Sequence, residues 1–146
     1  MADGVKMEPW QDYWKKDDAL FRSEMGNPGA QPADLMRRYL GDCDFKHTTL
    51  ANPYWHRSLF WFEMEPFLKE RKDQPWEIED YVAWSQERQA SKLSFAVATF
   101  KARFPRCGGF FLWMGHDCFP CPVNTSLLDF EGRPKPVGAA LAKVLK

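Results

Sequence analysis

The chain has 146 residues, a length that fits one domain, and 45% of them are hydrophobic, which is enough for a buried core. Twenty Lys and Arg residues balance twenty Asp and Glu residues, so the chain lacks the positive field that nucleic-acid binding requires. No apolar run approaches the roughly 20 residues that span a bilayer, and residues 1–10 lack the basic and apolar regions of a secretory signal. We therefore expect neither a nucleic-acid partner nor a membrane partner.

The first third of the chain predicts one short strand between two irregular segments. Residues 1–18 predict a loop with a helical turn at 10–14. Residues 19–23, ALFRS, predict a strand that ends at Glu24. The following residues 25–32 contain two glycines and two prolines, which forbid a regular element.

Helical patterns dominate the middle of the chain. Residues 33–40 predict a short helix that ends at Gly41, and residues 52–72 predict a partly helical segment because Asn52-Pro53 is a good helix start. The clearest helix is predicted from about residue 77 to 104, where buried positions recur every three or four residues and Pro105 stops the pattern.

The last part predicts a second strand and a last helix. Residues 110–114, FFLWM, form an apolar run that is typical of a strand buried on both faces of a parallel sheet. A long loop, 115–136, leads to a helix at about 137–145. The order strand, helical connection, strand, helix is a βαβα fragment, and because each buried strand needs neighbours on both edges, it favours part of a barrel. No internal repeat or second domain is indicated.

Chemically active side chains follow the two predicted strands. Glu24 closes the first strand, and Trp113 with His116 and Asp117 closes the second. In α/β folds the carboxyl ends of strands collect catalytic groups. A lone acid at a strand end is more often a solvated or capping residue, but the aromatic and acidic cluster on the second strand favours catalysis. Strand alternation places Arg22 on the same face as Glu24, where it would help to keep that carboxylate ionised.

Several linked motifs resemble one family of enzymes. FRSEMG, residues 21–26, resembles the SEFG-type nucleophile motif of family 2 glycoside hydrolases. Residues 84–145 resemble the final stretch of their catalytic barrel, in particular in the β-mannosidase branch. The matching motifs, in the family's order, are Ser85-Gln86, Gln89-Ala90, Gly108-Gly109, Trp113, His116-Asp117-Cys118-Phe119-Pro120, Ser126-Leu127-Leu128-Asp129 and Gly132-Arg133-Pro134-Lys135-Pro136. The likeness covers about residues 19–146 and is weakest between 40 and 76.

The resemblance implies a fold and a site. It implies an α/β fold, the C-terminal portion of a (β/α)8 TIM barrel with strands seven and eight and their helices, so that residues 1–146 form one partial catalytic domain. It implies a retaining exo-glycosidase that hydrolyses β-mannosides or related β-glycosides without a cofactor or metal. Glu24 is then the nucleophile and Trp113 an apolar platform for the sugar. Asp117 either accepts a hydrogen bond from a sugar hydroxyl or braces the platform; the alternative is an Asp that only starts the turn before Cys118.

The chain also departs from the family pattern. His116 stands where the family has Asn, Met114 where it has Gln, and Phe119 where it has Trp, so the polar contacts of that Asn are not expected here. The family's general acid/base is a Glu that follows Asn at the end of the fourth strand, and this sequence contains no Asn-Glu dipeptide. We therefore expect the 146-residue piece alone to be inactive, with the rest of the barrel or a second copy as its partner through open strand edges.

Three other interpretations remain open. Cys118 and Cys121 have the Cys-x-x-Cys spacing of redox sites, but the sequence after them predicts no helix to lower a thiol pKa. His116, Cys107, Cys118 and Cys121 are a nominal zinc set with crowded spacing. Four cysteines are too few for a disulfide framework, so the redox compartment of the protein stays open.

The 16% aromatic content, finally, favours a carbohydrate-binding or interaction module without catalysis.

Overall fold

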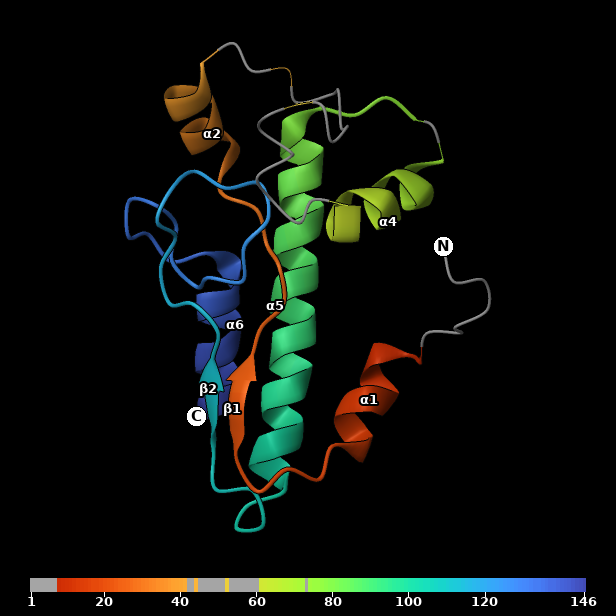
Figure 1. Ribbon diagram of the computed structural model, residues 1–146, viewed down its shortest axis with the longest axis vertical. Helices are drawn as coiled ribbons and strands as arrows, with labels where there is room; N and C mark the ends of the chain where they lie inside the picture. Colours follow the sequence, from red (N-terminus) through yellow and green to blue (C-terminus); the bar gives the residue numbers. More distant parts are fainter. Residues whose placement is uncertain (1–7, 42–43, 45–51, 53–60, 73) are drawn as a thin grey trace.

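The computed structural model describes residues 8–41, 44, 52, 61–72 and 74–146 (Figure 1). This part of the chain is a mixed α/β piece that contains five helices and two strands. The elements in chain order are α1 (Trp10–Lys16), β1 (Arg22–Met25), α2 (Ala33–Leu40), α4 (Trp61–Arg71), α5 (Ile78–Ala102), β2 (Phe110–Leu112) and α6 (Pro136–Leu145). The predicted order of strand, helical connection, strand and helix is confirmed.

The predicted helix boundaries agree closely with the observed ones, whereas the strand predicted at 19–23 is observed at Arg22–Met25 and the one predicted at 110–114 ends at Leu112. The helix predicted over 33–40 is α2, which ends at Gly41 in the left-handed conformation with φ 58°. The helical part of 52–72 is α4, and most of the rest of that segment lies outside the described residues. Among the residues that the structure describes, no helix is both long enough and apolar enough to cross a bilayer.

Helix α5 is the central support of the molecule (Figure 1). It begins with a capping box, in which the Glu77 backbone N–H donates to Asp80 Oδ2 at 2.8 Å and the Glu77 side chain accepts from the backbone of Asp80. Its stripe of buried residues follows the predicted three- and four-residue spacing. The stripe consists of Ile78, Tyr81, Val82, Ser85, Gln89, Leu93, Ala96, Val97 and Phe100.

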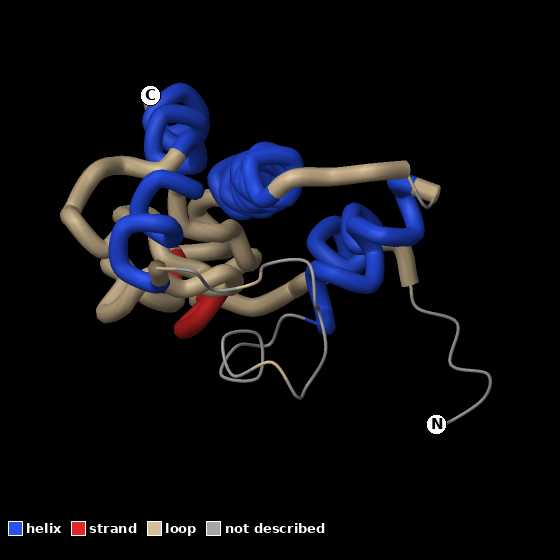
Figure 2. The backbone as a smooth tube through the Cα atoms, turned by 90° about the horizontal axis from the view of Figure 1, so that it is seen from above, coloured by secondary structure: helices blue, strands red, loops and turns tan. Residues whose placement is uncertain are grey.

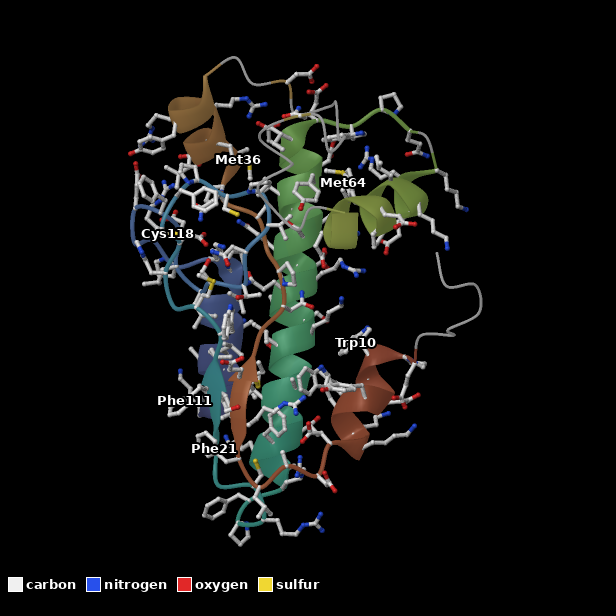
Figure 3. The ribbon with its side chains drawn as sticks, viewed as in Figure 1. Trp10, Phe21, Met36, Met64, Phe111 and Cys118 are labelled. Atoms are coloured by element: carbon white, nitrogen blue, oxygen red, sulfur yellow. The ribbon has the colours of Figure 1, made fainter. Side chains whose placement is uncertain are left out.

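Two apolar clusters divide this stripe. The first cluster joins the N-terminal half of α5 to α2 and α4 through buried residues such as Met36 and Met64, both labelled in Figure 3. The second joins the C-terminal half of α5 to α6 and to the helix-facing side of the strands through Met25, Val97 and Leu141. Among the described residues, the helices therefore pack against one side of the strands (Figure 2).

The two strands pair in parallel, with Arg22 opposite Phe110 and Met25 opposite Leu112. Their second face is left exposed by the part of the chain that the structure describes. Phe111 is 66% exposed and Phe21 is 47% exposed, and the two rings meet edge to face with centroids 5.1 Å apart (Figure 3). The expectation that the second strand is buried on both faces is therefore wrong in this part of the chain, because no layer of described residues covers Phe111.

Candidate functional site

Glu24 and Trp113 lie at the same edge of the sheet. Glu24 is an exposed residue near the end of β1, and Trp113 directly follows the last residue of β2. The Trp113 backbone N–H donates to the carbonyl oxygen of Met25 at 2.8 Å, so the parallel pairing extends to the carboxyl ends of both strands. Half of the Trp113 side chain, 48%, is exposed. The sequence-predicted acid and aromatic residue thus follow neighbouring strands in space, and their roles stay predictions.

Arg22 does not share this edge. Its Nη1 lies 3.1 Å from Asp17 Oδ2, its guanidinium lies 5.5 Å from the ring centroid of Trp14, and it donates a hydrogen bond to the Tyr13 hydroxyl. These contacts are with Tyr13, Trp14 and Asp17, and no ion pair of Arg22 with Glu24 is found among the described residues, so the support of Glu24 by Arg22 stays a prediction. From Arg22 to Met25 the chain advances three residues while β2 advances two, and this irregularity breaks the alternation on which the expectation depended.

Asp117 is completely buried beneath the loop that follows β2. One carboxylate oxygen accepts hydrogen bonds from Asn124 Nδ2 and Ser126 Oγ, and the other lies 2.9 Å from Lys135 Nζ. All of these partners are protein groups, and no part of Asp117 is accessible. Of the roles predicted for Asp117, bracing the loop of Trp113 agrees with these contacts.

Lys135 connects the loops that follow the two strands, and sequence analysis assigned it no role. Its ammonium group donates to the carbonyl of Gly29 at 3.0 Å and to Ser126 Oγ at 2.9 Å, in addition to the ion pair with Asp117. Burial lowers the pKa of Lys135, and the carboxylate of Asp117 opposes that shift. The sequence signal was slight, since a lysine between two prolines in a loop carries no periodic pattern.

Polar residues of α5 tether both loops from below. The Ala30 N–H donates to Ser85 Oγ at 3.1 Å, and Gln86 Nε2 donates to the Ala30 carbonyl at 2.9 Å. Gln89 Nε2 donates to the carbonyls of Thr125 and Ser126 at 3.2 and 3.0 Å. Ser85 and Gln89 are polar residues on the buried, mostly apolar face of the helix. This pattern is the sequence signal that could have indicated their hydrogen bonds to the loops. Because α5 is long and well packed, it gives both loops a rigid base.

Within the described part of the chain, the histidine and cysteines in and near the second loop are not grouped as a metal site. His116 and Cys118 are exposed, whereas Cys107 and Cys121 are buried, and Cys107 and Cys118 are free thiols. Within the described ranges, no group of three or more His, Cys, Asp or Glu residues is placed to hold a metal. No helix follows Cys118 until α6 begins at Pro136, so the redox interpretation lacks the helix N-terminus that it requires.

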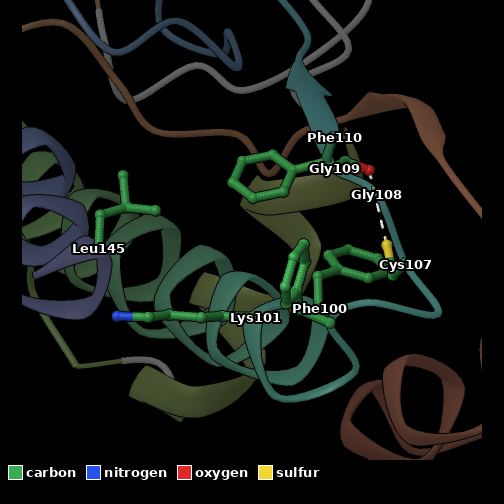
Figure 4. Close-up of a pocket in the computed structure, with 8 residues that line it drawn as sticks. Phe100, Lys101, Cys107, Gly108, Gly109, Phe110 and Leu145 are labelled. Carbon is green, nitrogen blue, oxygen red and sulfur yellow. Dashed lines mark hydrogen bonds between the residues drawn. The ribbon is translucent and has the colours of Figure 1, made fainter.

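A pocket of about 240 Å³ lies at the opposite end of the sheet, where β2 begins (Figure 4). Its lining residues are mostly apolar and come from the end of α5, the turn before β2 and the end of α6. They are Phe100, Lys101, Phe104, Cys107, Gly108, Gly109, Phe110 and Leu145. Glu24, Trp113 and Asp117 do not line this pocket, and Cys107 is the one member of the nominal zinc set that does.

Comparisons with known proteins identify relatives for part of the chain. No protein-family model matches it. Over 73 residues the chain is 34% identical to beta-mannosidase B of Aspergillus flavus and of Aspergillus oryzae, and 32% identical to that of Emericella nidulans. These alignments cover 48% of the chain, whereas the chain spans only 8% of the length of each relative.

The fold is also found in a solved structure. A beta-D-mannosidase from Dictyoglomus thermophilum matches 92% of this chain and 17% of its own chain, with a TM-score of 0.72 and 19% sequence identity. The chain is thus related to part of the β-mannosidases, which are glycoside hydrolases, and the resemblance inferred from the motifs is confirmed to that extent.

Proposed function

We propose that this chain is the C-terminal portion of the catalytic (β/α)8 barrel of a family 2 retaining exo-glycosidase that acts on β-mannosides or related β-glycosides. Residues 1–146 then form one partial catalytic domain, whose partner is the rest of the barrel. The observation that carries the proposal is the parallel pairing of β1 and β2, which brings Glu24 and Trp113 to one edge of the sheet. The relation to the β-mannosidases supports it.

Glu24 acts as the nucleophile in this proposal. Its carboxylate oxygen attacks the anomeric carbon while the bond from that carbon to the leaving oxygen breaks, and a covalent glycosyl-enzyme forms. A second carboxyl group, about 5–5.5 Å away in retaining enzymes, protonates the leaving oxygen and later activates the water that releases the sugar. That group comes from the rest of the barrel, so the 146-residue piece alone does not turn over substrate.

Trp113 provides the apolar face on which the sugar ring stacks, and Asp117 acts from beneath it. Because Asp117 is buried and holds Asn124, Ser126 and Lys135, it keeps the loop after Trp113 in one conformation. The site therefore combines an accessible acid with an aromatic platform on a rigid base, which is the arrangement that precise positioning of a substrate requires.

The test is covalent trapping of Glu24 in the complete gene product. Incubation with 2-deoxy-2-fluoro-β-mannosyl fluoride is expected to transfer the fluorosugar to the Glu24 carboxylate with release of fluoride, and the modified peptide is identified by mass spectrometry. Glu24→Gln is expected to remain unlabelled, whereas the control Glu87→Gln, at an exposed position of α5, is expected to be labelled like the unmodified protein. Labelling of a different carboxylate would contradict the proposal.

A carbohydrate-binding module without catalysis is the second candidate, and the exposed aromatic residues favour it. Phe21, Phe111 and Trp113 are all more than 40% exposed on or beside the sheet. Glu24→Gln separates the two functions in the complete gene product. If the protein is a binding module, Glu24→Gln lowers its sugar affinity, and there is no turnover to lose. If the protein is an enzyme, Glu24→Gln abolishes turnover.

A further inference from the structure

We infer that Thr125 is a positioning residue that sets the orientation of Trp113 relative to Glu24. The benefit of this orientation for sugar binding rests on the proposed function, whereas the orientation itself follows from the contacts of Thr125. The Thr125 hydroxyl donates to the carbonyl of Trp113 at 2.9 Å. Because the Trp113 N–H already donates to Met25, both backbone polar groups of Trp113 are held, and the direction in which its side chain leaves the backbone is set.

Thr125 also contacts the chain directly after Glu24. A Cβ atom added to Gly26 would lie 2.9 Å from Thr125 Cβ and 3.0 Å from its Cγ2, so the glycine backbone lies tightly against the threonine side chain. Thr125 is thus a spacer between the end of β1 and the residue that follows β2. Any larger residue at position 26 therefore requires Thr125 or the backbone at position 26 to move.

The backbone of Thr125 is itself held by hydrogen bonds. The Thr125 N–H donates to Asn124 Oδ1 at 2.8 Å, and its carbonyl accepts from Gln89 of α5 at 3.2 Å. Immediately after Trp113 the chain turns sharply, since Met114 has a φ of 64°, which L-residues with a side chain rarely adopt. Trp113 is therefore the last residue held by hydrogen bonding between the strands. Thr125 supplies the hydrogen bond to the Trp113 carbonyl that the neighbouring strand does not provide.

The experiment separates the hydroxyl from the shape of Thr125. Thr125→Val keeps the branched shape and removes the donor, whereas Thr125→Ser keeps the donor. The chain is labelled with 5-fluorotryptophan, and Trp113→Phe assigns the Trp113 resonance among the seven tryptophans. We expect Thr125→Val to shift or broaden that resonance and Thr125→Ser to leave it close to that of the unmodified chain.

Thr99→Val is the matched control, because the Thr99 hydroxyl also donates to a backbone carbonyl, that of Phe95 at 2.9 Å, within α5. It is expected to leave the Trp113 resonance unchanged. Gly26→Ala is the second variant, and it is expected to shift the resonance even where Thr125→Val does not fold. An unchanged Trp113 resonance in Thr125→Val, or in Gly26→Ala where Thr125→Val does not fold, would overturn the inference.

A sugar titration keeps this result distinct from the proposed function. In the complete gene product, methyl β-D-mannoside is expected to bind to Thr125→Val about two- to tenfold more weakly than to the unmodified protein, the range expected for one net hydrogen bond. Its affinity for Thr125→Ser is expected to stay within about twofold of that for the unmodified protein. Absence of binding to the unmodified protein would count against the proposed function, whereas the fluorine resonance would still decide the role of Thr125. Equal affinity in Thr125→Val and the unmodified protein would overturn the positioning role.

Discussion

Lys135 and Asp117 form an ion pair in which neither side chain is exposed. Removing one partner of a buried pair leaves the other charge without compensation and typically costs about 3–5 kcal/mol. We therefore predict that Lys135→Met lowers the free energy of unfolding by roughly that amount. Urea denaturation followed by circular dichroism measures the change.

The control for this prediction is an ion pair at the surface. Lys16→Met breaks the contact of Lys16 with Glu8, in which both side chains are more than a third exposed, and it is expected to change stability little. The double variant Lys135→Met with Asp117→Leu is expected to be more stable than Lys135→Met alone, because it removes the orphaned carboxylate. A stability of Lys135→Met equal to that of Lys16→Met would show that the buried pair is not important for the fold.

Glu63 gives a prediction on pH dependence. The residue lies in α4, is 4% exposed and has Arg88 Nε 3.5 Å from its Oε2. Burial raises its pKa above the ordinary value of 4.5, and Arg88 opposes the shift. Since the folded state holds this proton more tightly than the unfolded chain, the stabilisation is complete below pH 4.5 and is lost as the pH rises through the raised pKa.

We therefore expect Glu63→Gln, which has no proton to lose, to remove this decrease in stability with rising pH. Urea midpoints of both proteins, measured from about pH 4 to pH 8, give the difference as a function of pH. Glu65→Gln, at an exposed position of the same helix, serves as the control. If the pH profiles of Glu63→Gln and the unmodified protein are parallel, burial does not control the protonation of Glu63.

The contact between α5 and the loop after β1 depends on a glycine. A Cβ atom at Gly29 would lie 2.7 Å from Gln89 Cδ and 3.0 Å from Gln89 Cβ, and the Gly29 N–H donates to the Asn124 carbonyl at 2.8 Å. Gly29→Ala therefore displaces the Gln89 side chain, whose amide holds the carbonyls of Thr125 and Ser126, and we predict a loss of about 1–3 kcal/mol in the free energy of unfolding. Gly115→Ala has nothing within 4 Å of the added Cβ atom and is the matched control. Equal denaturation midpoints for the two variants would contradict this packing.

Sequence pattern predicted the helices better than the strands. Helix α5 was predicted to within two residues at its C-terminus because 25 residues of regular spacing and a following proline all indicate the same element. The irregularity in β1 could not be predicted, since it depends on how four residues of one strand meet three of another. The strand predicted at 19–23 is accordingly observed at Arg22–Met25, and the guanidinium of Arg22 pairs with Asp17.

The candidate site was predictable only where residues are adjacent to a strand. Glu24 and Trp113 follow β-strand patterns and were found from the sequence. Lys135 and Thr125 themselves lie in the long irregular loop between β2 and α6, where no periodicity indicates which side chain turns inward. Only the motif order preserved by the family resemblance marked that loop as more than a connection.

The exposed aromatic face of the sheet is expected to drive association of the whole molecule. Phe21 and Phe111 are exposed side by side on a sheet with two strands, and both outer edges of the sheet are free of other strands among the described residues. Exposed apolar patches on open sheets favour association, because burying them removes apolar surface from water and pairs the strand edges. We expect the rest of the barrel to cover this face in the complete gene product and a second copy to cover it when the chain is alone.

The last prediction follows from that face. The 146-residue chain is expected to self-associate, and the double variant Phe21→Ser with Phe111→Ser is expected to shift it towards monomer, as measured by sedimentation velocity over a range of concentrations. Phe104→Ser is the matched control, because Phe104 is 74% exposed but lies at the rim of the pocket, away from the sheet face. A monomeric unmodified chain at all concentrations, or an equal effect of Phe104→Ser, would show that the aromatic face does not drive association. A shift towards monomer in the double variant alone would identify this face as the surface through which copies of the chain associate.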